Sequence, residues 1–225
     1  CSGYQHNDSF PGSHPLAVGP LGYNGSKAAM ELISKADVVL ALGTRLNPFS
    51  TLPGYGIDYW PKNAKIIQVD MNPDRIGLTK KVTVGICGDA KMVAQQILEK
   101  LSKNAGDSGR EERKNLIHQT KSAWLQTLTG LDHEEDDPGT VWNKEARERD
   151  KDRMSPRQAW RAIQEAIPSD AIISSDIGNN CAIGNAYPTF EKGRKYLAPG
   201  LFGPCGYGFP AILGAKIGCP DTPVI

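Results

Sequence analysis

Glycine and asparagine residues follow an apolar run near residue 175, where they are suited to bind a phosphate group. The run "AIISS" is followed by Asp176, Ile177, Gly178, Asn179 and Asn180. In parallel α/β sheets, ligands gather at the carboxyl ends of the strands. A glycine there lets the backbone approach a ligand, and free N–H groups at a helix start attract anions. The pattern indicates a phosphate or diphosphate site; the alternative is an ordinary strand–helix turn with capping asparagines.

A second glycine-rich stretch, "GPCGYGFPA", follows the next predicted strand. Its centre is formed by Gly203, Pro204, Cys205 and Gly206. Glycines at these positions let backbone N–H and carbonyl groups reach a flat ligand. One such cluster by itself is more often a loop. Two of them after neighbouring strands of one sheet are less frequent by chance, so ligand binding becomes a hypothesis of equal standing with the loop.

The other polar residues match no known catalytic pattern. Gly43, Thr44 and Arg45 end one predicted strand and Asp70 ends the next. A strand-terminal acid can bind ribose, but no GxGxxG lies between them, so the spacing favours a packing role. GxSxG, HExxH and Walker A motifs are missing as well. The four histidines have no metal-like spacing and are predicted to be solvated: His6, His14, His118 and His133.

Composition excludes several classes of protein. The chain has 225 residues and a formal charge of +1, which gives no electrostatic reason to expect nucleic acid or a membrane surface as partner. No apolar run approaches the roughly 20 residues that span a bilayer. Five cysteines without a CxxC pair indicate reduced thiols in a cytoplasmic protein, with no disulfide framework and no zinc site.

Alternating strand and helix patterns in the first hundred residues predict a parallel α/β sheet. Ser26 is a good N-cap for a helix whose apolar stripe is formed by Ala29, Leu32, Ile33 and Ala36. "DVVLALG" at 37–43 is typical of a strand covered on both faces. "KIIQVD" (65–70) and "VTVGI" (82–86) are predicted strands, and Asp89 is expected to cap a helix with the apolar residues Val93, Ala94, Ile97, Leu98 and Leu101.

The middle of the chain differs from both ends. Residues 102–150 alternate in charge and contain no strand-like run, so we expect a connector that is partly helical and partly mobile, with its charges in solvent. The predicted domains are therefore 1–103, the charged connector 104–152, and 153–225.

The α/β pattern begins again after residue 153. Ser155 and Pro156 are expected to start a helix with Trp160, Ile163 and Ile167 on one side. Strands are predicted at 170–175 and 195–200, followed by the glycine cluster and a buried helix. The chain begins with Cys1 and stops at "DTPVI", which resembles the opening of a strand. We therefore expect a fragment of a longer protein.

Two long segments resemble thiamine-diphosphate enzymes of the acetohydroxyacid-synthase type. "CSGYQHNDSFPGSHPLAVGPLGYNGSKAAMELISKADVVLALGTRL" is similar to their central domain, and "SSDIGNNCAIGNAYPTF" with "LAPGLFGPCGYGFPAILGAKIG" is similar to the opening half of their cofactor domain. The implied fold is α/β, a central Rossmann-like (DHS-like) parallel-sheet domain followed by the first part of a thiamine-diphosphate-binding domain.

The resemblance also implies roles for the two turns. Residues 176–180 would contact the diphosphate, and residues 203–206 would lie against the aminopyrimidine and thiazolium rings. A bulky apolar residue usually stands at the position of Cys205 in this family. Because cysteine is smaller, either a neighbour such as Phe202 fills the gap or the support for the bent cofactor is weaker.

The activity implied by the resemblance is transfer of an acetyl group made from sulfoacetaldehyde, with release of sulfite, to phosphate, as in taurine degradation. The runner-up is an acetolactate synthase-type carboligase that acts on pyruvate. Two alternatives belong to other functional classes: a noncatalytic nucleotide-binding protein and an NAD-dependent deacylase. The missing CxxC pairs disfavour the deacylase.

The resemblance places the rest of the machinery outside these residues. The Mg²⁺ motif is expected after Ile225 and the activating glutamate before Cys1, so no catalytic residue or metal ligand is expected within the chain. We therefore expect the chain to be inactive by itself. The family also implies a homodimer or homotetramer, and FAD is bound in the central domain of some relatives.

Overall fold

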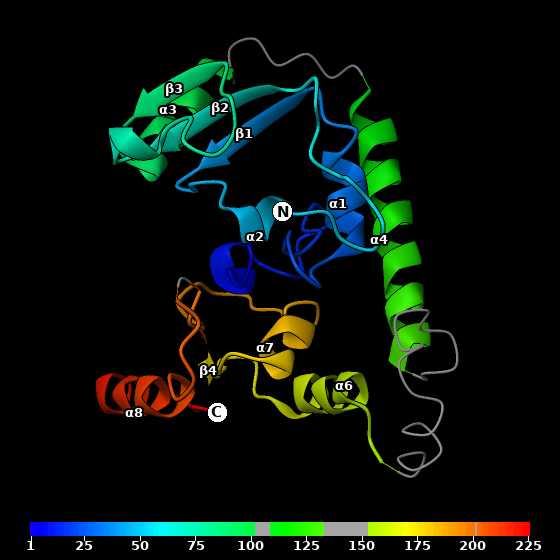
Figure 1. The fold of residues 1–225 in the computed structure, drawn as a ribbon, viewed down its shortest axis with the longest axis vertical. Coiled ribbons are helices and arrows are strands. Elements are labelled where there is room, and N and C mark those ends of the chain that lie inside the picture. Colours follow the sequence, from blue (N-terminus) through cyan, green and yellow to red (C-terminus); the bar gives the residue numbers. More distant parts are fainter. Residues whose placement is uncertain (102–108, 133–152, 201) are drawn as a thin grey trace.

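Two parallel sheets organise the chain (Figure 1). This computed structural model describes residues 1–101, 109–132, 153–200 and 202–225. The first sheet has the order β1 (Val38–Leu42), β2 (Lys65–Asp70), β3 (Val84–Cys87). The second pairs β4 (Ile173–Ser174) with β5 (Tyr196–Leu197). Parallel pairing in both sheets confirms the α/β class expected from the alternating pattern.

Among the described residues, the first sheet is covered well on one face only. Ala41 and Ile66 are buried with Leu46 on one side of the sheet. On the other side Leu40 of β1 is 43% exposed, because α3 (Ala90–Leu101) packs against β2. The prediction that the first strand is covered on both faces is therefore wrong for this structure. The cap predicted for α3 is confirmed, since the Asp89 carboxylate accepts a hydrogen bond from Met92 N at 2.9 Å.

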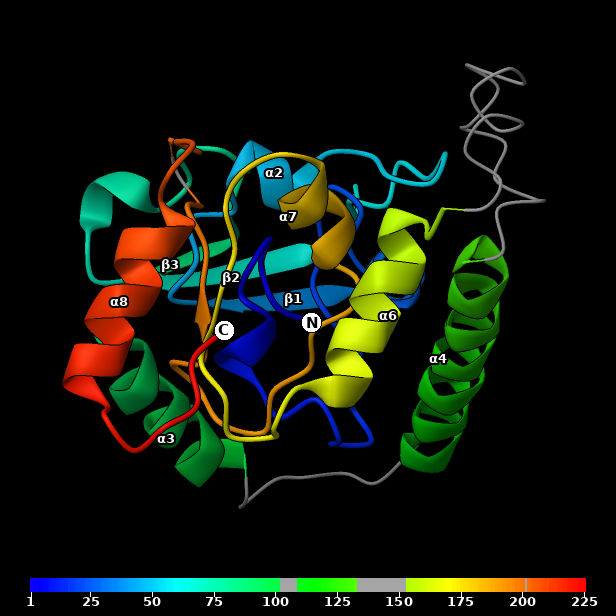
Figure 2. The ribbon, with the colours of Figure 1, turned by 90° about the horizontal axis from the view of Figure 1, so that it is seen from below.

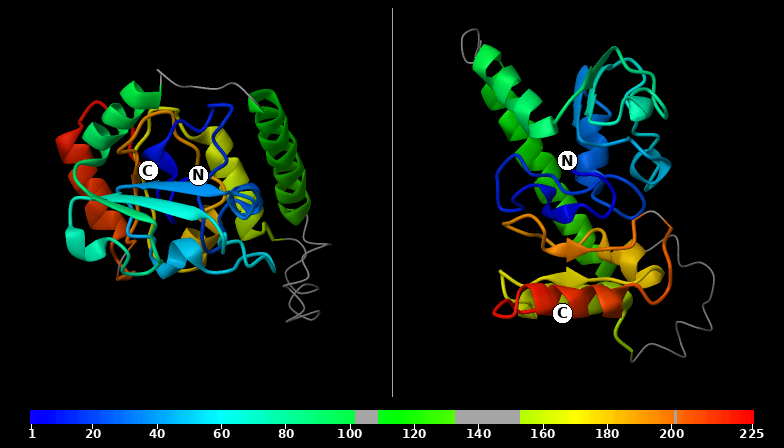
Figure 3. Two further views of the ribbon diagram at one scale, coloured as in Figure 1. Left: turned by 90° about the horizontal axis from the view of Figure 1, so that it is seen from above. Right: turned by 90° about the vertical axis from the view of Figure 1, so that its left-hand side faces the viewer.

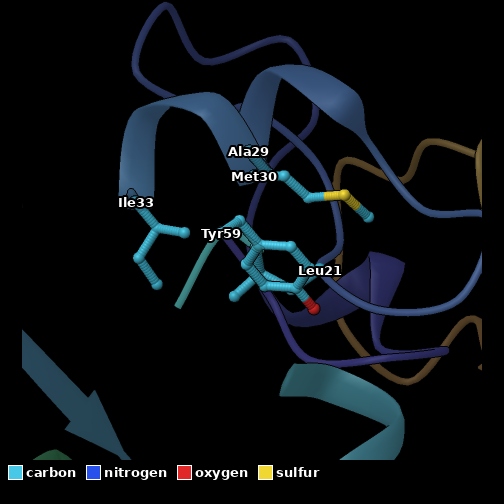
Figure 4. Close-up of a cluster of buried hydrophobic side chains, with 5 residues drawn as sticks. All are labelled: Leu21, Ala29, Met30, Ile33 and Tyr59. Atoms are coloured by element: carbon cyan, nitrogen blue, oxygen red, sulfur yellow. The ribbon is translucent and has the colours of Figure 1, made fainter. Parts of the chain in front are cut away.

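Helix α1 (Lys27–Ile33) builds the main core of the first unit, which we define as residues 1–101. Its N-cap is Ser26, whose Oγ accepts from Ala29 N at 3.2 Å. The helix ends at Ile33, so Ala36 is not part of its apolar stripe. Met30 is fully buried in the helix, whereas Leu32, which was predicted to belong to the stripe, is not among its buried residues. Figure 4 shows the resulting cluster of Leu21, Ala29, Met30, Ile33 and Tyr59.

Tyr59 ties this core to the short helix α2 (Pro48–Thr51). Its hydroxyl donates to the carbonyl of Ser50 at 3.0 Å, and burial raises the pKa of Tyr59 to about 12. Asn47 caps α2 by accepting from Ser50 N at 2.9 Å. Two short 3-10 helices complete the unit, Asn7–Ser9 and Pro73–Arg75.

Helix α4 (Arg110–Asp132) runs along the side of both units (Figures 1 and 2). Its Trp124 and Leu128 are buried in one cluster with Ala28 of α1, Trp160 and Tyr187. The helical part of the expected connector is thus a packed element, whose buried pair is four residues apart on one helix face. The rest of that connector lies outside the described residues, and the domain boundaries stay a prediction.

The second unit, residues 153–225, begins with α6 (Pro156–Ala166). Ser155 and Gln158 form the reciprocal capping box that starts this helix. Trp160 packs on α7 (Asn179–Gly184), where Gly184 leaves room: a Cβ there would lie 2.5 Å from the Trp160 ring. The predicted strand at 170–175 is paired with β5 over only two residues, and Ile172 forms a parallel bridge with Val224. Of the strand expected at "DTPVI", the structure shows this single bridge.

Helix α8 (Gly208–Gly218) is not the buried helix that was predicted. It packs against β4 and β5, but Phe209 is 77% exposed and Ile217 is 76% exposed. Ile163 of α6 is likewise 41% exposed. A helix that is apolar on every side is typical of full burial, whereas the described residues offer α8 neighbours on one side only.

We predict that Leu128→Ala lowers the stability of the full-length protein far more than Leu125→Ala. Leu128 is 6% exposed and Leu125, one turn earlier on the same helix, is 53% exposed. Removing the buried side chain leaves a cavity and costs about 2–5 kcal/mol, while the exposed site costs about 0.5 kcal/mol or less. Thermal unfolding of both variants checks this, and equal shifts in Tm would show that α4 is not part of the core.

Candidate functional site

The two predicted turns lie at the same edge of the second sheet, because β4 and β5 are parallel and each turn follows a strand end. Gly178 has φ of 114° and ψ of −160°, Gly203 has φ of 55° and Gly206 has φ of 85°. Backbone with positive φ is strained for residues that carry a Cβ. These three glycines are therefore required by the shape of the turns.

Asp176 joins the turns. Its carboxylate accepts hydrogen bonds from Gly206 N at 2.8 Å, Tyr207 N at 2.8 Å and Gly208 N at 3.2 Å. The hydrogen bond from Gly206 is the largest cause that holds the pKa of Asp176 below its usual range. Asp176 therefore orders the second turn. The diphosphate contact that the resemblance implies for residues 176–180 stays a prediction.

Ile177 makes the second connection between the turns. A Cβ added to Gly203 would lie 3.1 Å from the Ile177 side chain, which is tighter than most such contacts. The two turns are thus in direct contact through an apolar side chain as well as through Asp176. Each turn therefore helps to fix the position of the other.

The two asparagines differ in what they can offer to a ligand. Asn180 donates from Nδ2 to Ser175 Oγ at 3.3 Å, and its carbonyl accepts from Trp160 Nε1 at 2.9 Å. Asn179 is exposed, and its side chain makes no hydrogen bond within the part of the chain that the structure describes. No side chain in the described ranges caps the start of α7. Asn179 is therefore the amide that is free to bind a ligand.

The second turn is open to solvent. Pro204, Cys205 and Gly206 are exposed, and Cys205 carries a free thiol. Phe202 is 91% exposed, so it does not fill the space beside Cys205 in this structure. The turn presents backbone and one small side chain to a ligand.

Residues of the first unit that the sequence did not single out lie behind these turns. Tyr4 OH lies 3.6 Å from Cys181 Sγ, and the Gln5 side-chain amide donates to the same sulfur. Burial raises the pKa of the Cys181 thiol and of the Tyr4 hydroxyl, so both are neutral. About 180 residues separate the partners, and no local pattern in the sequence could pair them.

The other candidate residues have local structural roles. Asp70 is buried and accepts from Asn72 N at 2.9 Å, and Gly43 adopts a φ of 61° at the end of β1. These contacts favour the packing role. His6, His14 and His118 are exposed, while His133 lies outside the described residues.

The described residues show no further site formed by paired cysteines, by metal ligands or by a membrane-spanning helix. All five cysteines are free, and only Cys181 is buried. The described residues contain no group of side chains that could hold a metal ion. None of the helices that the structure describes is long and apolar enough to cross a membrane.

Comparison with known proteins places this arrangement in a family. Residues 1–97 match the model of the thiamine pyrophosphate enzyme central domain, and residues 176–225 match that of the C-terminal TPP binding domain. The chain belongs to the thiamine pyrophosphate enzymes. Thiamine pyrophosphate is another name for thiamine diphosphate, and the second match begins at Asp176, at the first turn.

Individual relatives refine this assignment. The chain is 80% identical over its whole length to a probable sulfoacetaldehyde acetyltransferase of Rhizobium meliloti (strain 1021), of which it covers 38%. It is 78% identical over its whole length to a sulfoacetaldehyde acetyltransferase of Roseovarius nubinhibens, of which it covers 37%. An acetolactate synthase large subunit of Corynebacterium glutamicum is 30% identical over 96% of the chain, which covers 31% of that protein. The chain spans between 31% and 38% of the length of these three relatives.

We predict that the second turn loosens in acid through Asp176. Because its pKa is lower when folded than when unfolded, the stabilisation is present above the unfolded value of about 3.9 and is lost as the pH falls through the folded pKa. Hydrogen–deuterium exchange of residues 206–208, corrected for its intrinsic pH dependence, should rise over that interval. Asp176→Asn should raise it at neutral pH, whereas Asp221→Asn, at an exposed site, should not.

Proposed function

We propose that the full-length protein is a thiamine-diphosphate-dependent acetyltransferase that converts sulfoacetaldehyde and phosphate into acetyl phosphate and sulfite. The observation that carries the proposal is the pair of glycine turns joined at one sheet edge, within the residues matched by the TPP binding domain. The names of the relatives at 80% and 78% identity support the substrate. As a step in sulfonate breakdown, the reaction would serve the degradation of taurine.

The residues of the two turns fit the cofactor. Gly178 and Asn179 are exposed where the diphosphate would lie, and they present backbone N–H groups together with one free amide. Gly203 and Gly206 have no Cβ, so the flat rings of the cofactor can approach the backbone closely. When bound, thiamine diphosphate supplies a nucleophilic carbon that attacks the aldehyde carbonyl.

We assign the remaining residues of the turns to binding and orientation. Ile177 and Asp176 hold the two turns together, Asn180 stabilises the first turn through Ser175, and Pro204 and Cys205 would lie against the cofactor rings. Cys205 is smaller than the bulky apolar residue usual in the family, and Phe202 does not compensate for it. The support for the bent cofactor is therefore expected to be weaker here.

An acetolactate synthase-type carboligase is the second candidate, favoured by the 30% identity to such a subunit. It would bind the same cofactor at the same turns and act on pyruvate. We further propose that the full-length protein binds Mg²⁺ with the diphosphate, works as a homo-oligomer and is cytoplasmic. Five free thiols support a reducing compartment.

The substrate assignment predicts a specific stoichiometry. Full-length protein supplied with thiamine diphosphate, Mg²⁺, sulfoacetaldehyde and phosphate should release sulfite and acetyl phosphate in equal amounts. Both products should vanish when the cofactor or phosphate is omitted. If pyruvate is consumed and no sulfite is released, the cofactor assignment stands, the substrate assignment is wrong, and the protein is a carboligase.

The cofactor assignment predicts that Gly206→Ala weakens thiamine diphosphate binding at least fivefold. Gly206 has φ of 85° and open space around it, so the added methyl group acts through backbone strain alone. Gly214→Ala is the matched control, because Gly214 lies within α8, also has open space and does not have a positive φ. Titration of full-length protein with the cofactor and Mg²⁺, followed calorimetrically, measures both dissociation constants. Equal values would place the cofactor away from this turn.

A further inference from the structure

Gln5 combines two features that are costly to a folded chain. It is a non-glycine residue with φ of 59°, and its side chain is almost fully buried, with the residue 3% exposed. Its Oε1 has no hydrogen-bond partner among the residues that the structure describes. Backbone strain and a buried acceptor without a partner both oppose folding, and such features concentrate at functional sites.

The side chain of Gln5 reaches the elements behind both turns. Its amide nitrogen donates to Cys181 Sγ on α7, the helix that starts at the first turn. Its Oε1 faces Gly200, since a Cβ placed on Gly200 would lie 3.7 Å from that oxygen. Gly200 leads from β5 into the second turn. The Gln5 amide therefore lies between the supports of the two turns.

Neighbours of Gln5 bind the same two elements. The Gln5 backbone N–H donates to Asn185 Oδ1 at 3.0 Å, and Asn7 Nδ2 donates to the Asn185 carbonyl at 3.0 Å. Asn185 is the residue that ends α7. Asp8 accepts from Lys195 N at 2.9 Å at the start of β5. Figure 3 shows this first segment of the chain, in blue, lying between the two units.

We propose that Gln5 is a positioning residue, whose buried side chain packs between Cys181 of α7 and Gly200 and so sets the separation at which the two turns bind one thiamine diphosphate molecule. This inference rests on the function proposed above. Gln5 acts through Cys181 and Gly200 and does not touch the cofactor. A glycine at this position would relieve the positive φ and remove the unpaired oxygen, but it would also leave a cavity and remove the donor to Cys181 Sγ. The contribution of Gln5 to the spacing of the turns is therefore distinct from its contribution to the stability of the fold.

Gln5→Gly in the full-length protein separates these two roles. The variant leaves a cavity, which lowers stability, and relieves the backbone strain, which raises stability, so the change in Tm should be small. The dissociation constant for thiamine diphosphate, titrated with Mg²⁺, should increase at least tenfold. Gln5→Met keeps most of the side-chain volume and should give an intermediate value. His6→Gly is the matched control, because His6 is the exposed neighbour, and it should leave binding within twofold of the unchanged protein.

A second readout does not depend on the cofactor. In the apoprotein, Gln5→Gly should raise hydrogen–deuterium exchange at residues 178–182 and at residues 203–207, while His6→Gly should not. The inference is overturned if exchange at both turns is unchanged, or if affinity falls only in proportion to a lower Tm. If the unchanged protein binds no thiamine diphosphate, the proposed function fails, and the exchange experiment still decides whether Gln5 spaces the turns.

Discussion

The carboxylate of Asp176 accepts hydrogen bonds from the backbone of residues 206–208, and the shape of the whole site depends on this contact. Asp176 ends the strand region of β4, whereas its partners start α8 some thirty residues later. Two short strands with two paired residues each cannot by themselves hold two exposed turns in register. A charged acceptor with several N–H donors can, because charge-assisted hydrogen bonds are about twice as strong as neutral ones.

The connection between the units depends on elements that are distant in sequence. Helix α4 buries Trp124 and Leu128 against α1 and α6, and the segment around Gln5 and Asp8 forms hydrogen bonds with α7 and β5. The first contact is apolar and sets the position of the units coarsely, since apolar burial has no preferred direction. The second is polar and directional, so it fixes the supports of the turns more closely.

Sequence reasoning located the turns but did not anticipate the contacts that join them. Gly178, Gly203 and Gly206 were expected from their place after predicted strands, and each has a positive φ. Asp176 was expected at the diphosphate, which stays a prediction, and its hydrogen bonds with the second turn were not anticipated. Gln5, Cys181 and Asn185 were not anticipated, because their pairing spans the length of the chain and leaves no periodic pattern. The exposed faces of β1 and α8 were not predicted for a related reason. Apolar content predicts that a face is buried, but it does not show which residues cover that face.

By itself, the sequence determined the strands, the capped helices, the α/β class and the position of two glycine-rich turns at strand ends, because these depend on local spacing and on the conformational freedom of glycine. The resemblance of its motifs also indicated the family. Only the tertiary structure decided that Asp176 serves the second turn, that α4 is packed core, and that Gln5 lies strained between the supports of both turns. These three features depend on contacts between segments that are distant in the sequence. Such contacts determine the hydrogen bonds and the burial of a residue, and its neighbours along the chain do not.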